Sequence, residues 1–96
     1  MLTPENLSWL DDQDINDLLS ATACIYTLVG NPLMYAVGQH LDKEVIRRKM
    51  TFTDKEIEEQ NIKIFGIGKS YKEMIYIAIA IIKEKSEKVK SLINAN

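Results

Sequence analysis

The segment of this chain closest to a chemical motif is Gly66-Ile67-Gly68-Lys69-Ser70. A phosphate-binding loop of the form G-x-x-x-x-G-K-S lies between a strand and a helix and surrounds phosphate with backbone amides and a lysine. Gly68, Lys69 and Ser70 match the end of that pattern, but Lys63 stands where its first glycine is needed. The segment therefore predicts a turn before a helix. Simple anion or phosphate binding by Gly66, Gly68, Lys69 and Ser70 is the alternative.

Two other groups have a spacing that could bind metal, and both lack ligands. The segment 12–16 imitates the start of a calcium-binding loop, but the glycine at the sixth position and the glutamate at the twelfth are missing. His40 and Glu44 share a helix face, yet the chain has one His and one Cys, Cys24. Nothing resembles a catalytic triad. We expect no enzyme, no catalytic residue, no metal and no cofactor.

The charges of the chain are strongly polarised. Residues 1–42 hold six acidic residues and no Lys or Arg, which gives −6; residues 43–96 hold 12 basic and 8 acidic residues, which gives +4, and the sum is −2. Oppositely charged ends tend to pair within a chain or between copies. The expected pairing joins an acidic cluster to a basic one, within or between subunits: Asp11, Asp12, Asp14 and Asp17 with Arg47, Arg48 and Lys49.

Length and composition indicate one domain over residues 1–96, without a wholly disordered segment. A pI near 5.3 argues against a protein that mainly coats nucleic acid. The lone cysteine fits a reducing compartment, and the start of the chain lacks the basic residues of a signal peptide, so we expect a cytoplasmic protein. Ile outnumbers Val and Lys outnumbers Arg, a bias typical of AT-rich genomes that would suit a phage or mobile-element accessory protein.

Apolar spacing and capping residues predict an all-α fold, a compact bundle of three to four helices with a long C-terminal helix. A short helical turn begins after Thr3, where Pro4 suits the first helical position. The main helices are expected over about 14–29, 32–49, 53–64 and 70–92. Lys83, Lys85, Lys88 and Lys90, interleaved with two glutamates, indicate a solvated helix end.

Two segments admit a second interpretation. Isoleucines alternate over 75–81, which suits a strand, but a capping box, Ser70 to Glu73, precedes them and helix-forming residues follow without a turn. Residues 18–41 lack charged side chains over a length that could span a bilayer, but Gly30-Asn31-Pro32 interrupts them. We therefore expect helix in the first segment and a buried core, not a membrane span, in the second.

The last helix is apolar on too many sides for a surface helix, so we expect a second protein surface to cover it. The residues expected to mediate self-association are Tyr71, Ile75, Tyr76, Ile79 and Ile82. The predicted function is a non-enzymatic protein-interaction module that acts as a homo-oligomer and binds a further protein. A less favoured alternative is a DNA-binding regulator, because 56–75 has a helix-turn-helix outline with Lys69 and Lys72 on the reading helix.

Overall fold

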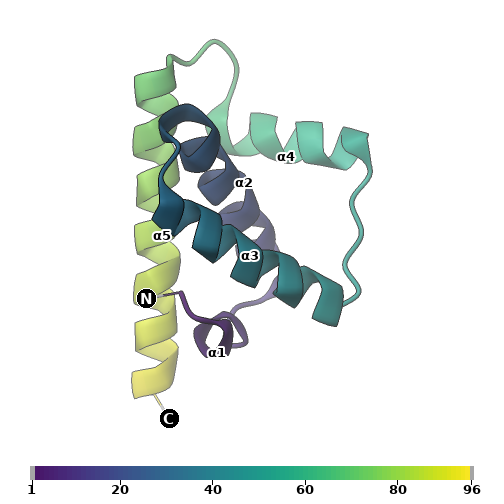
Figure 1. Ribbon diagram of the computed structural model, residues 1–96, viewed down its shortest axis with the longest axis vertical. Helices are drawn as coiled ribbons and strands as arrows, with labels where there is room; N and C mark the ends of the chain where they lie inside the picture. The colour runs from purple at the N-terminus through teal and green to yellow at the C-terminus, as the bar shows by residue number, and fades with distance from the viewer. Residues whose placement is uncertain (1, 96) are drawn as a thin grey trace.

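The computed structural model describes residues 2–95 and contains five helices there (Figure 1). Their bounds are α1 Pro4–Leu7, α2 Asp12–Val29, α3 Pro32–Arg47, α4 Asp54–Phe65 and α5 Tyr71–Asn94. The predicted all-α fold with a long C-terminal helix is confirmed. None of these helices is long and apolar enough to cross a membrane.

The helix ends follow from local hydrogen bonds. The Asp11 side chain accepts from the backbone N–H of Asp14 at 2.8 Å, and the Asp14 carboxylate accepts from the N–H of Asp11 at 3.3 Å. This reciprocal cap starts α2 two residues before the predicted start. Gly30 ends the helix with φ 70°, a left-handed conformation that glycine adopts without a steric penalty.

The isoleucine-rich segment 75–81 lies entirely within α5, so its helical interpretation is confirmed. Ser70 caps this helix by accepting from the N–H of Glu73 at 3.2 Å. Ala78 and Val89 lie on the buried face of α5, one within each of the two core clusters. Tertiary packing of this face therefore overrides the strand preference of alternating β-branched residues.

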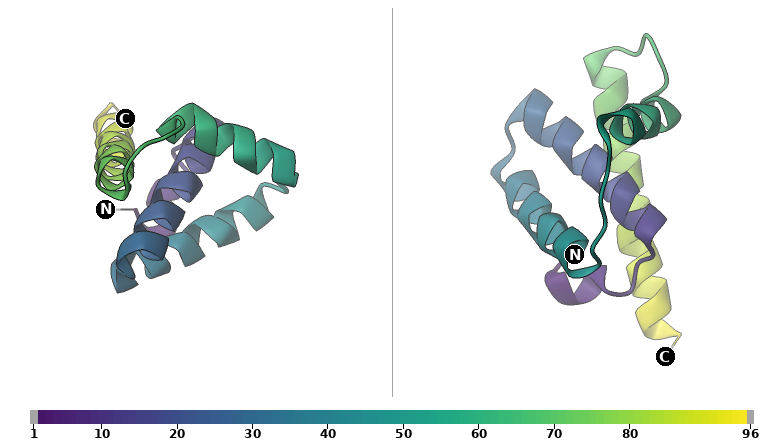
Figure 2. Two further views of the ribbon diagram at one scale, coloured as in Figure 1. Left: turned by 90° about the horizontal axis from the view of Figure 1, so that it is seen from above. Right: turned by 90° about the vertical axis from the view of Figure 1, so that its right-hand side faces the viewer.

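The central element is α2, with α5 along one side and α3 and α4 on the other (Figure 2). Leu7, Ile15, Leu18 and Leu41 are fully buried where α1, α2 and α3 meet. A second cluster of Ala21, Ile25, Phe65 and Ala78 joins α2 to α4 and α5. The helices α3 and α4 diverge from α2 and are connected at their far ends by residues 48–53 (Figures 1 and 2). On α2, Ala23 and Thr27 are exposed.

Candidate functional site

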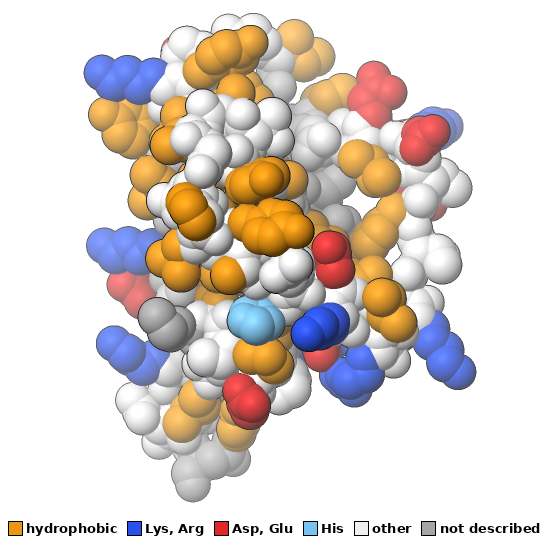
Figure 3. Space-filling model, in the orientation of Figure 1, with side chains coloured by type: hydrophobic (Ala, Val, Ile, Leu, Met, Phe, Trp, Pro, Cys, Tyr) orange, Lys and Arg blue, Asp and Glu red, His pale blue; other side chains and the backbone are white. Residues whose placement is uncertain are grey.

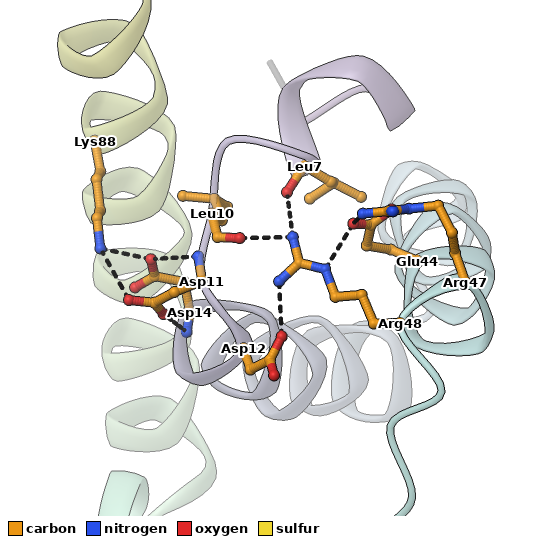
Figure 4. Close-up of polar contacts among 9 residues, drawn as sticks. All are labelled: Leu7, Leu10, Asp11, Asp12, Asp14, Glu44, Arg47, Arg48 and Lys88. Atoms are coloured by element: carbon orange, nitrogen blue, oxygen red, sulfur yellow. Dashed lines mark hydrogen bonds and ion pairs between the residues drawn. The ribbon is translucent and has the colours of Figure 1, made fainter.

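Arg48 joins the acidic N-terminal segment to α3 (Figure 4). Its Nη1 lies 3.0 Å from Asp12 Oδ1, and its Nε lies 2.7 Å from Glu44 Oε2. Its Nη2 donates to two backbone carbonyl oxygens, at 3.1 Å to Leu7 and 2.6 Å to Leu10. The planar guanidinium thus satisfies the carbonyls at the end of α1 while pairing with two carboxylates, a role that its fork of donors suits.

The remaining acidic residues of the cluster pair with α5. Lys85 Nζ lies 2.9 Å from Asp14 Oδ1 and 3.3 Å from Asp17 Oδ2, and Lys88 contacts Asp14 and Asp11. Burial alone raises the pKa of Asp14, but hydrogen bonds from Lys88 and Lys85 outweigh it and lower that pKa to about 2. Burial alone would lower the pKa of the Lys85 ammonium, but its contacts with Asp14 and Asp17 outweigh this effect and raise that pKa. Among the pairs predicted for this cluster, Asp12–Arg48 is the one that forms.

The other predicted basic residues have different neighbours. Arg47 pairs with Glu44 of its own helix, and Lys49 is exposed with φ 58°. The hydrogen bond from Arg47 is the largest cause that lowers the pKa of Glu44 to about 2. Lys85 was predicted to lie on a solvated helix end, and this is wrong, because the residue is only 6% exposed. Since the charges that meet here are paired within one chain, this cluster stabilises the fold rather than offering a binding site.

The loop Gly66–Ser70 lies exposed between α4 and α5. Two of the predicted anion-binding groups already have a carboxylate partner, because Glu73 accepts from the Ser70 hydroxyl at 3.1 Å and lies 3.8 Å from Lys69 Nζ. Gly66 and Gly68 have φ values of 74° and 77°, as tight turns require. Anion binding here, and DNA binding through the neighbouring start of α5, stay predictions.

The apolar residues predicted for self-association differ in exposure. Tyr71 is 71% exposed, Tyr76 61% and Ile79 49%. Ile75 and Ile82 are half-buried, and Ile82 packs against both core clusters. The exposed face of α5 is therefore rotated away from Ile75 and Ile82 and passes through Tyr76 and Ile79.

A second uncovered surface lies across α2, where two hollows of about 340 Å³ each adjoin. One lies between α2 and the second half of α4, and the other extends toward α3 and Phe52. Both are lined by Ser20, Ala23 and Asn61, so they form one groove, which we call the α2 groove. Ala23 also lines a third hollow of about 220 Å³ beside Tyr26 and Tyr35. In Figure 3 the surface is hollowed between the main body and the arm that α4 forms.

The floor of the α2 groove is made of small side chains and its walls are apolar. Asn16, Ser20, Ala23 and Thr27 follow one another along one face of α2, at the spacing of successive helical turns. Ile57, Ile62 and Phe65 of α4 form one wall, and Val45 of α3 contributes to the other. In the part of the chain that the structure describes, Asp42 is the one charged residue that lines these two hollows. The groove therefore offers apolar contact area and little chemistry for catalysis.

The sequence contained a signal for the α2 groove that the predicted sites did not use. Residues 18–29 carry no charge around the whole circumference of their helix, so more of this helix is apolar than one buried face requires. Lys85 and Lys88, by contrast, gave no signal, because their buried partners lie more than 60 residues earlier in the chain. Among residues 2–95, no group of three or more His, Cys, Asp or Glu side chains could hold a metal ion.

Comparisons with protein-family models, with curated proteins and with solved structures give no match to this chain. Two parts of its surface carry exposed apolar side chains: the α2 groove and the outer face of α5.

Proposed function

We propose that this chain is a non-enzymatic protein-interaction module whose α2 groove binds an amphipathic helix of a partner protein. The observation that carries the proposal is the open groove floored by Ala23, which is exposed although it lies at the centre of the longest uncharged segment of α2. Exposed apolar surfaces of this kind commonly mark sites where another protein docks. An amphipathic helix laid into an apolar groove is a recurrent mode of such recognition.

The dimensions of the groove suit a short helix. Its floor runs from Asn16 to Leu28, which corresponds to about 18 Å of helix at 1.5 Å per residue. A partner helix of about 12 residues would match that length and could place three apolar side chains at i, i+4 and i+7. The small residues Ser20 and Ala23 let a second helix axis approach to about 8 Å, the short end of the usual packing range.

The charges around the groove indicate the chemistry of the partner. Asp42 of α3 lines one hollow, and Glu56 and Glu59 of α4 line the small hollow that adjoins it at Asn16 and Gln60. Lys63 lies at the same edge and offsets part of this negative charge. We therefore expect a partner helix with an apolar face flanked by Lys or Arg, and an association rate that falls with salt.

The experiment is a selection from a displayed library of helical 14-residue peptides on the parent protein, after which each enriched peptide is measured against the variant Ala23→Arg. Arginine is a good helix former and Ala23 is exposed, so the variant keeps α2 while filling the groove with a long charged side chain. Peptides that bind the parent protein should share apolar residues at i, i+4 and i+7 with basic flanks. Their affinity for Ala23→Arg should fall at least tenfold.

The matched control is Ala80→Arg, the same substitution at an exposed alanine of α5. It should leave peptide binding unchanged, because Ala80 lies outside every residue set that lines the groove. A selection on the parent protein that enriches no peptide over the starting library would overturn the proposal. So would peptides that bind the parent and the Ala23→Arg variant equally well.

A further inference from the structure

The outer face of α5 carries a stripe of six exposed residues, which we call the α5 stripe: Lys72, Tyr76, Ile79, Ala80, Lys83 and Glu87. Successive members are separated by 4, 3, 1, 3 and 4 residues, so the spacing reads the same in both directions. These steps keep all six on one side of the helix. The buried residues Ala78, Lys85 and Val89 lie on the opposite side, against α2.

We infer that two copies of this chain associate through antiparallel packing of their α5 stripes, about a twofold axis that passes between Ile79 and Ala80. In such a pair the symmetric spacing places each residue opposite its counterpart from the other end of the stripe. A closed twofold interface requires this self-complementarity, since each copy presents the same surface. The inference is independent of the α2 groove, because no residue of the α5 stripe lines it.

The residues that meet across the axis are chemically complementary. Lys72 of one copy faces Glu87 of the other, which pairs opposite charges at both ends of the interface. Tyr76 faces Lys83, an ammonium–ring contact of the kind that Lys72 Nζ already makes with Tyr76 at 5.9 Å within one chain. Ile79 faces Ala80 at the centre, where a large side chain next to a small one lets two helices approach closely.

The charges also decide the direction of packing. In a parallel pair each residue would face its own copy, so that Lys72 would meet Lys72, Lys83 would meet Lys83 and Glu87 would meet Glu87. Every charged contact of the stripe would then be repulsive. The antiparallel pair turns the Lys72 and Glu87 contacts into attractions, and it also aligns the two helix dipoles favourably.

The extent of the stripe predicts a dimer of moderate stability. From Lys72 to Glu87 it covers about 22 Å of helix, shorter than most obligate interfaces need. Tyr76 and Ile79 are its large apolar members, and they are 61% and 49% exposed in the single chain. We expect dissociation constants in the micromolar range, within reach of sedimentation equilibrium.

The experiment is a charge swap measured by sedimentation equilibrium on the full chain. Lys72→Glu and Glu87→Lys should each weaken the dimer at least tenfold, because each creates a like-charge contact twice in the symmetric pair. The double variant Lys72→Glu/Glu87→Lys restores opposite charges at both places and should return the dissociation constant to within about threefold of the parent value. Ala80→Arg should abolish dimerisation, whereas Ala23→Arg should leave it intact.

All of these residues are exposed, so each variant should keep the helical circular dichroism of the parent. A parent chain that stays monomeric at millimolar concentration would overturn the inference. So would a dimer whose stability does not change in the single variants, or one that the double variant fails to restore. Loss of peptide binding in Ala23→Arg with an intact dimer separates the groove from this interface.

Discussion

Asp14→Asn should reduce the dependence of stability on pH, because the Asp14 carboxylate is buried against Lys85 and Lys88. Its pKa is about 2 in the folded chain and 3.8 as an ordinary aspartate. A carboxyl whose pKa is lower in the folded state stabilises the fold above its ordinary pKa, and this contribution is lost as the pH falls toward the folded value. The difference corresponds to about 2 kcal/mol at pH 7, of which about 1 kcal/mol is lost by pH 3.

The substitution itself should destabilise the chain at neutral pH by about 3 kcal/mol, the lower end for removing one partner of a buried ion pair. The lower end applies because Lys85 keeps Asp17 at 3.3 Å. Since the asparagine no longer binds a proton, the gap between variant and parent should narrow by about 1 kcal/mol between pH 7 and pH 3. Glu44, whose pKa is also about 2, stays in both proteins and cancels from the comparison.

The assay is urea unfolding followed by circular dichroism at pH 7, 5, 4 and 3, for the parent, Asp14→Asn and the control Glu58→Gln. Glu58 is an exposed carboxylate of α4. Because it is exposed, its replacement should change the free energy of unfolding at pH 7 by no more than about 0.5 kcal/mol. If the Asp14→Asn curve of free energy against pH runs parallel to the parent curve, the carboxylate is not held ionised by Lys85 and Lys88, and the reasoning fails.

Two further pairs of substitutions test the fold by chemical denaturation. Arg48→Lys should lower the free energy of unfolding by about 2 kcal/mol, because an ammonium cannot contact Glu44, Asp12 and two backbone carbonyls at once as the guanidinium does. Arg47→Lys should lower it far less, because the Arg47 side chain is 62% exposed, and equal effects of the two variants would contradict the role of the Arg48 guanidinium. Gly30→Ala should destabilise the fold by about 1 kcal/mol, because the φ angle of Gly30 is 70°. Gly38→Ala should stabilise the fold by about 0.5–1 kcal/mol, because Gly38 lies inside α3 with nothing within 4 Å of the added carbon, and effects of the same sign would contradict this account.

The helices of this chain were predictable because their signals are local. The Thr53–Glu56 capping box starts α4 as predicted, and Pro32 stands at the first position of α3. The start of α2 was predicted two residues late, because Asp11 and Asp14 cap each other and a run of three acidic residues does not reveal which one is the cap. Boundaries of this kind depend on one hydrogen bond rather than on a periodic pattern.

The candidate sites were less predictable because they depend on which helices meet. Lys85 has the sequence context of a solvated lysine, and only the arrival of Asp14 and Asp17 from α2 makes its burial tolerable. With Lys85 on the buried side of α5, Ile75 and Ile82 are half-buried, and Lys72, Tyr76 and Glu87 lie on the exposed side. The α2 groove depends in turn on the divergence of α3 and α4, which no local pattern encodes.

The polarised charge of the sequence also changes its meaning once the fold is known. It suggested pairing within a chain or between copies, and the acidic residues 11–17 find their basic partners within the same chain. The charge polarity of the sequence therefore no longer argues for assembly, and the proposed self-association rests on the α5 stripe alone. The two proposed surfaces, the α5 stripe and the α2 groove, lie on opposite sides of α2, since α5 lies on one side and α3 and α4 on the other (Figure 2).

That arrangement has a consequence for binding. A dimer that pairs two α5 stripes would leave both α2 grooves open and facing away from the twofold axis. The two grooves of one dimer can bind two helices of the same partner assembly. Once the first helix is bound, the second binds at a high effective concentration, so the total affinity rises although each groove makes the same contacts as before. The gain exists only if the partner presents its helices at the matching separation. A single peptide should therefore bind the parent and Ala80→Arg equally, whereas a partner with two such helices should bind the parent more tightly.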